Sequence, residues 1–227
     1  MRNLRRWTNK LSILLKPHKE VPVLRWTAAH PWEMSKERMI ILSIGLATFG
    51  LGDALVIASG LGNAPWSVLA QGLAIRLGIS IGVATVMVGV GVLTLWIPLR
   101  RRIGIGTILN ILIISIFIDI GLTLFPKPIG LGFEIFYLLI GITLVGLGSA
   151  LYLSCGLGAG PRDGLMTGLN EKTGIRIGRI RLFLELSVLT LGALLGGTVG
   201  LGTALFALLI GQSIAIWLGV VSRTTSR

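Results

Sequence analysis

Six long apolar stretches, separated by short polar segments, dominate the pattern along the chain. They cover residues 39–59, 80–99, 105–125, 135–155, 177–196 and 200–220. Each is close to the roughly 20 residues that an α-helix needs to cross a bilayer. The pattern therefore predicts an all-α polytopic membrane protein with six transmembrane helices.

The composition supports a membrane protein and argues against a protein that binds nucleic acid. Of the 227 residues, 53% are hydrophobic and 13% are charged, whereas roughly a quarter are charged in a soluble domain. The net charge of +12 would raise the question of nucleic acid in a soluble protein. Here the charges lie between and beyond the apolar stretches, which is typical of topogenic charge. We expect a lipid bilayer as partner and no nucleic acid.

The residues that usually carry catalysis or bind metals are scarce. The chain has one cysteine, Cys155, and two histidines, His18 and His30, which both precede the first apolar stretch. One thiol cannot form an internal disulfide, and no spacing of these residues matches a metal site. No nucleophile–base arrangement is visible either. We expect no metal, no cofactor and no enzymatic activity.

Lysine and arginine lie mainly on one side of the predicted bundle. Residues 1–38 hold nine of the 21 basic residues. When the loops are assigned alternately to the two faces, nineteen fall on the face of the N-terminus and two on the other. Such a bias places both termini in the cytoplasm. An eight-span alternative would place Arg100, Arg101 and Arg102 outside, so we reject it.

The two halves of the chain repeat each other at a constant offset of 96 residues. The segment GLGNAPWSVLAQGL at 60–73 returns as GLGAGPRDGLMTGL at 156–169. Glycines stay in step over about 80 positions without a gap, which indicates an internal duplication. Because each unit has three spans, the second is predicted to be inverted relative to the first. The predicted segments are a basic cytoplasmic or interfacial segment 1–38, a first repeat 39–125, a linker 126–134, a second repeat 135–220 and a tail 221–227.

A glycine-proline break begins the shared segment of each unit. Proline suits the first position of a helix, so a helix is predicted to start at Pro65 and Pro161 and to run to Leu77 and Thr173. About 13 residues span only about 20 Å. These helices are either re-entrant, with their N-termini facing a substrate pathway, or they lie flat at the interface. The predicted pathway residues are Asn63, Pro65, Trp66, Ser67, Gln71, Gly160, Pro161, Arg162, Asp163 and Thr167.

Three acidic residues lie inside predicted spans: Asp53, Asp119 and Glu185. An ionisable group in a bilayer is costly unless it is paired or hydrated, so each is a candidate for ion coupling. Glu185 follows Arg181 by four residues, and for this residue an intrahelical ion pair is the favoured interpretation. We assign Asn110 to a hydrogen bond between helices.

The segments GLGNAPWSVLAQGL and GLGAGPRDGLMTGLNEKTGIRIG resemble the bacterial YczE/YyaS/YitT family of integral membrane proteins. The similarity covers residues 39 to 220. It implies a multi-span protein of the bacterial inner membrane, and it supplies no catalytic residues.

Two functions follow as expectations. The first is a small secondary transporter of an unidentified small solute, with an anion as one option, that works by rocking one repeat against the other. The alternative is a non-transporting membrane partner that anchors or regulates a cytoplasmic enzyme through its basic N-terminal segment and the 170–181 loop. The oligomeric state stays open, with a homodimer as one option.

Overall fold

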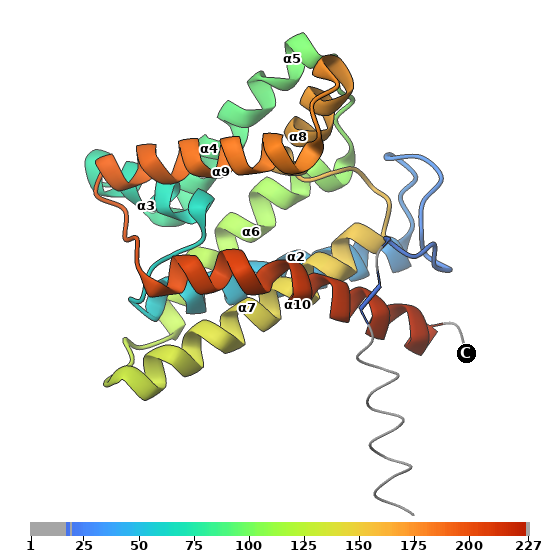
Figure 1. Ribbon diagram of the computed structural model, residues 1–227. Coiled ribbons are helices and arrows are strands. Elements are labelled where there is room, and N and C mark those ends of the chain that lie inside the picture. Colours follow the sequence, from blue (N-terminus) through green and yellow to red (C-terminus); the bar gives the residue numbers. More distant parts are fainter. Residues whose placement is uncertain (1–16, 19, 226–227) are drawn as a thin grey trace, which may run out of the picture.

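The computed structural model describes residues 17–18 and 20–225, and this part of the chain contains helices and no strand (Figure 1). The all-α prediction is confirmed. Residues 1–16 and 19 of the predicted N-terminal segment 1–38 lie outside the described residues. The helices are α2 (Lys36–Ala58), α3 (Pro65–Leu77), α4 (Ile81–Thr94), α5 (Trp96–Leu99), α6 (Ile105–Leu124), α7 (Leu131–Ser154), α8 (Pro161–Thr173), α9 (Ile177–Leu194) and α10 (Leu201–Thr225).

Among the described residues, five helical stretches are long and apolar enough to cross a membrane. They are α2, the continuous stretch Ile81–Leu99, α6, α7 and α10, and they match five of the six predicted spans. The sixth prediction, at 177–196, corresponds to α9. This helix carries Arg179, Arg181 and Glu185 within 18 residues, which makes it more polar than the other five.

The helices form two groups (Figure 1). Helices α2, α6, α7 and α10 pack together, and α3, α4, α5, α8 and α9 form the second group. Helices α2 and α7 touch through glycines: a Cβ on Gly45 would lie 3.1 Å from the carbonyl oxygen of Gly148, and a Cβ on Gly52 would lie 2.8 Å from that of Gly141. The two backbones are therefore in direct contact, as small residues allow in membranes.

Helices α3 and α8 differ in how closely their neighbours approach them. Gly192 of α9 lies directly on the backbone of α3 at Val68 and Leu69. The equivalent position in the first half of the chain, 96 residues before Gly192, is Trp96. This residue begins α5, and its side chain is buried against α8. Its indole N–H donates a hydrogen bond to the carbonyl of Pro161 at 3.0 Å. Helix α8 is thus held through an indole ring, whereas α3 is held by backbone contact.

The two short helices follow the predicted bounds. Each begins with proline at its first position and ends at a left-handed glycine, Gly78 with φ 66° and Gly174 with φ 70°. A left-handed glycine is a common helix terminator because it has no Cβ to clash. The loops before the two helices also match, with left-handed glycines at corresponding positions: Gly60, Gly62, Gly156 and Gly158.

Each of these loops is bonded to the start of a helix in the other half of the chain. The amide of Gly106 in α6 donates to the carbonyl of Leu157 at 2.8 Å, and the amide of Gly202 in α10 donates to that of Leu61 at 2.7 Å. The four residues are two pairs that differ by 96 positions. The loop before α8 is therefore fixed by a helix of the first half of the chain, and the loop before α3 is fixed by the equivalent bond from a helix of the second half.

Residues 24–34 form a strap across one end of the bundle. The indole N–H of Trp26 donates to the Ser154 hydroxyl at 3.1 Å. The amide of Ala28 donates to the carbonyl of Cys155 at 2.9 Å, and that of Ile105 donates to the carbonyl of Pro31 at 3.2 Å. This part of the predicted N-terminal segment is an integral element of the fold.

Candidate functional site

A cavity of about 280 Å³ lies between the two helix groups, where both short helices begin. Pro65 and Pro161 both line it. Helices α2, α6, α7 and α10 supply one side, and α3, α8 and α9 supply the other. The repeated proline breaks therefore meet at one place in the structure.

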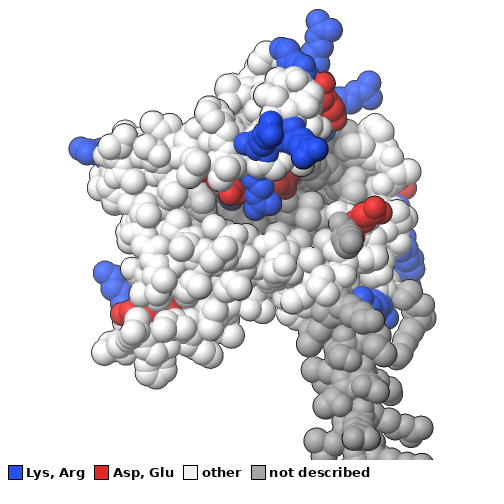
Figure 2. All heavy atoms as spheres, in the orientation of Figure 1, with Lys and Arg blue, Asp and Glu red and all other residues white. Residues whose placement is uncertain are grey.

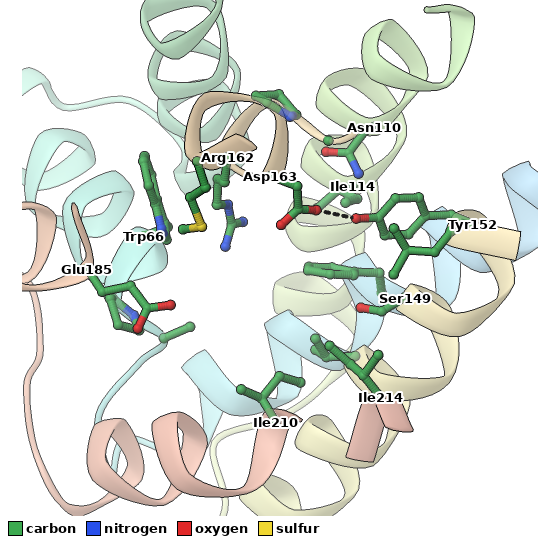
Figure 3. Close-up of a pocket in the computed structure, with 18 of the residues that line it drawn as sticks. Trp66, Asn110, Ile114, Ser149, Tyr152, Arg162, Asp163, Glu185, Ile210 and Ile214 are labelled. Atoms are coloured by element: carbon green, nitrogen blue, oxygen red, sulfur yellow. Dashed lines mark hydrogen bonds between the residues drawn. The ribbon is translucent and has the colours of Figure 1, made fainter. Parts of the chain in front are cut away.

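Arg162 enters this cavity from the first turn of α8 (Figure 3). Its guanidinium carbon lies 5.5 Å from the ring centroid of Trp66, a cation–π contact. Within the described part of the chain, Arg162 has no ion pair and no hydrogen bond. A guanidinium carries five donors, and leaving them unpaired is costly away from bulk water. An anionic ligand would satisfy this side chain.

Trp66 supplies a second unsatisfied donor. It is 6% exposed, and its indole nitrogen has no hydrogen-bond partner among the described residues. A buried indole N–H usually finds an acceptor. Its ring lines the same cavity as Arg162.

Asp163 follows Arg162, and its side chain points toward Tyr152, on the side of the cavity opposite to Trp66 (Figure 3). Its carboxylate accepts a hydrogen bond from the Tyr152 hydroxyl of α7 at 2.8 Å. Its place in the first turn of α8 also suits a negative charge, because the N-terminal end of a helix dipole is positive. Asp163 has no ion pair among the residues that the structure describes.

Helix α9 contributes an ion pair to the cavity wall. Arg181 and Glu185 both line the cavity and are joined at 2.8 Å, and they lie four positions apart in the sequence. The predicted intrahelical pair is therefore confirmed. Figure 2 shows acidic and basic side chains gathered in a hollow beside α9. Glu185 belongs to the site and is paired within it.

The opposite wall is largely apolar. Ile210 and Ile214 of α10 line it (Figure 3), together with Phe206 of α10, Phe49 of α2 and Ile114 of α6. Asn110 of α6 and Ser149 and Tyr152 of α7 add polar groups to the same side. The charged groups thus lie at the α8–α9 side, and α10 faces them with hydrocarbon.

Asp53 lies beside the first turn of α3. The carboxylate is 2% exposed, and Oδ2 accepts a hydrogen bond from the Ser67 hydroxyl at 2.7 Å. The other oxygen, Oδ1, has no partner in the described part of the chain. The positions 96 residues later hold Ser149 and Asp163. The acid and the hydroxyl have therefore exchanged places between the two units.

Three predicted pathway residues serve as structural contacts. Asn63 donates to the side-chain oxygen of Gln71 at 2.8 Å, and the same oxygen accepts from the amide of Thr198 at 2.6 Å. Thr167 accepts from Arg101 at 3.1 Å. None of these is among the residues that line the described cavity. Ser67 lines a smaller adjoining space of about 40 Å³.

Asp119 lies away from the cavity and is not one of the residues that line it. Its carboxylate accepts from the Ser80 hydroxyl at 2.6 Å and from the amide of Gly82 at 2.7 Å. These groups form the N-terminal end of α4, where a carboxylate satisfies free N–H groups and the helix dipole. Asp119 is therefore placed as a helix cap.

Sequence reasoning missed several residues of the site, and two of them are polar groups opposite the first turn of α8. Tyr152 of α7 and Asn110 of α6 both line the cavity. Tyr152 is one of two tyrosines and lies in an apolar stretch, so its buried hydroxyl was an available signal. Asn110 was assigned to a contact between helices. Nothing in the local pattern showed that these two residues face the first turn of α8.

These features define a polytopic helical membrane protein with a charged cavity at the junction of two short helices. A family of unknown function, DUF6198, matches residues 36–218. The chain belongs to this family.

Three curated proteins are similar to this chain over most of their length. An uncharacterized protein of Haemophilus influenzae is 43% identical over 203 residues, 89% of this chain and 93% of its own. The uncharacterized membrane protein YczE of Bacillus subtilis is 33% identical over 219 residues, 92% and 95%. The uncharacterized protein YyaS of the same organism is 31% identical over 185 residues, 79% and 92%. No solved structure matches.

These relatives confirm the resemblance to YczE and YyaS. The link to YitT stays a prediction. The chain is a membrane protein, as the YczE relative and the apolar helices agree.

Proposed function

We propose that this protein is a small secondary transporter of a solute with an anionic group. The observation that carries the proposal is Arg162, an arginine without an ion pair or hydrogen bond to any described residue, inside a cavity where two short helices begin. Paired helix breaks around a polar cavity are typical of transporter substrate sites.

The proposed mechanism needs two inverted units, and reciprocal contacts support them. Gly45 meets Gly148, and the positions equivalent to these two, Gly141 and Gly52, meet each other. Reciprocity of this kind is the property of a two-fold axis. Trp66 and Arg162 are equivalent positions that contact each other, which is the arrangement expected at the axis itself. We place the cavity on this axis and α9 as the sixth span.

Burial favours the re-entrant alternative for α3 and α8. Seven of the 13 residues of α3 are buried, and the first residues of both helices line the internal cavity. A helix lying flat on a membrane surface would bury one face and expose the other. We propose that both helices enter the bundle and return.

The cavity lies where movement would change access to it. It separates the group of α2, α6, α7 and α10 from the group that contains α3, α8 and α9. Rocking of one group against the other around a fixed site is the usual form of alternating access. We assign Asp53 to proton coupling, because a buried carboxylate with one hydrogen bond is costly when ionised.

We propose an inner-membrane location with both termini in the cytoplasm, on the bias of nineteen basic residues against two. The alternative, a regulatory membrane partner, depends in part on a free N-terminal segment. Residues 24–34 are instead bonded to the ends of α6 and α7. Deleting residues 1–30 would remove part of this strap and would not separate the two functions.

Uptake into proteoliposomes tests the proposal. Sealed vesicles with an imposed proton gradient would be offered labelled phosphate, sulfate, succinate, glutamate and leucine. We expect at least one probe to accumulate, and Arg162→Gln to abolish its uptake. Arg176→Gln is the matched control, because Arg176 is exposed and does not line the cavity. Absence of uptake for every probe, with a co-reconstituted control transporter active, would refute transport of this kind.

A further inference from the structure

The charges in the cavity are balanced, and two of them have no ion-pair partner. Two basic residues, Arg162 and Arg181, and two acidic residues, Asp163 and Glu185, line it. Arg181 and Glu185 are joined to each other. Arg162 and Asp163 are consecutive and share no ion pair with a described residue. The site therefore offers one free charge of each sign.

A purely anionic ligand would match only half of this arrangement. It would neutralise Arg162, but it would lie next to the carboxylate of Asp163, which carries the same sign of charge and repels it. A dianion such as phosphate would also leave uncompensated charge in a cavity with formally neutral walls. A ligand with one positive and one negative group adds no net charge and pairs with both residues.

The rest of the cavity limits the size and character of the ligand. Its volume of about 280 Å³ lies near the lower end of the roughly 300–1,000 Å³ typical of ligand sites. Ile210 and Ile214 face the charged side (Figure 3), so the part of the ligand away from its charges meets hydrocarbon. A polar body there would lose hydrogen bonds to water without replacement.

We propose that the solute is a small zwitterion with an apolar body, of the chemical class of apolar α-amino acids. Its carboxylate pairs with Arg162, and its ammonium group binds Asp163. The side chain packs on α10. The inference rests on the proposed transport function and narrows its substrate.

Binding to the full-length protein in nanodiscs tests this assignment. The probes are leucine, 4-methylpentanoate, which lacks the ammonium group, and 3-methylbutylamine, which lacks the carboxylate. We expect leucine to bind, and removal of either charged group to weaken binding about tenfold or more, the usual scale for a charged hydrogen bond.

Two variants separate the roles of the charges. Asp163→Asn keeps an oxygen for the Tyr152 hydroxyl and removes the charge, so it should weaken leucine binding about tenfold while leaving 4-methylpentanoate unchanged or tighter. Arg162→Gln should weaken both. Glu171→Gln is the matched control, because Glu171 lies on the same helix and pairs with Arg101 instead. Unchanged melting temperatures verify that each variant is folded.

The results distinguish this inference from the transport proposal. If 4-methylpentanoate binds as tightly as leucine and Asp163→Asn has no effect, the zwitterion is refuted and transport of an anion survives. If phosphate or succinate is transported and none of the three probes binds, the inference is also refuted. Failure of every uptake assay refutes the transport function itself.

Discussion

Trp96 anchors the start of α8 through Pro161. Its indole N–H donates to the Pro161 carbonyl at 3.0 Å, one residue before Arg162. A carbonyl at this position has a free lone pair even when the helix ladder is complete. The position of Arg162 in the cavity therefore depends on a tryptophan in another helix.

Gly164→Ala should destabilise the protein, because its Cβ would overlap the Trp96 ring. We expect a loss of about 1–3 kcal/mol, the usual cost of overpacking, measured by thermal unfolding in detergent. Gly91→Ala is the control, since a Cβ there meets open space. In a Trp96→Ala background the cost should disappear. Equal stability of the Gly164 and Gly91 variants would contradict this packing.

Cysteine labelling should place two loops on one side of the membrane. Arg101 pairs with Glu171 at 2.7 Å, so the loop after α5 and the end of α8 are in contact. In a Cys155→Ala background, Arg102→Cys and Lys172→Cys should react with an impermeant maleimide from the same side. Arg76→Cys and Lys127→Cys should react from the other side. Labelling of positions 102 and 172 from opposite sides would overturn the two inverted units.

Asp53 and Asp119 should respond differently to neutralisation. Asp53→Asn keeps an acceptor for Ser67 but cannot exchange a proton. We expect proton-driven accumulation to fall to background, while exchange of solute across the vesicle membrane continues. Accumulation that persists in Asp53→Asn would remove Asp53 from the coupling step.

Asp119→Asn should lower stability by about 0.5–2 kcal/mol, the usual value of a helix cap, since it weakens the contact with Ser80 and Gly82. Proton-driven accumulation of solute by this variant should stay intact. Thermal unfolding and uptake measured on the same preparation separate these effects. Loss of coupling at full stability would instead return Asp119 to the transport path.

Trp26→Ala should loosen the strap. It removes the bond to Ser154 and the packing against Leu218 and Val221. We expect a loss of about 1–3 kcal/mol, less than the 3–5 kcal/mol of a fully buried tryptophan, from the melting curve. Val23→Ala is the control, because Val23 is 88% exposed. Equal melting of the two variants would show that the strap adds no stability.

The helices could be predicted closely from the sequence because their signals are local. Proline and glycine set the bounds of α3 at Pro65 and Leu77, and those of α8 at Pro161 and Thr173. The same is true of the Arg181–Glu185 pair, whose spacing is a single helical turn.

The composition of the site was only partly predictable, since it depends on which distant faces meet. Prolines, Trp66 and the first turn of α8 were expected in the pathway, and they line the cavity. Asn63 and Gln71 have the same polar character but bind Thr198. Tyr152 faces Asp163 only because α7 packs across the bundle. The periodicity of apolar residues predicts which face of a helix is buried, but it does not predict which other helix packs against that face.

The left-handed glycines at 60, 62 and 78 and at 156, 158 and 174 imply a pattern in large-scale mutagenesis. Any side chain at these positions costs roughly 1–2 kcal/mol of backbone strain, even where open space surrounds it, as at Gly60 and Gly174. After selection for folded protein, a saturation library would therefore lose most substitutions at these two sets of three glycines, which lie 96 codons apart. The loops of this protein would tolerate less variation than many of its lipid-facing leucines.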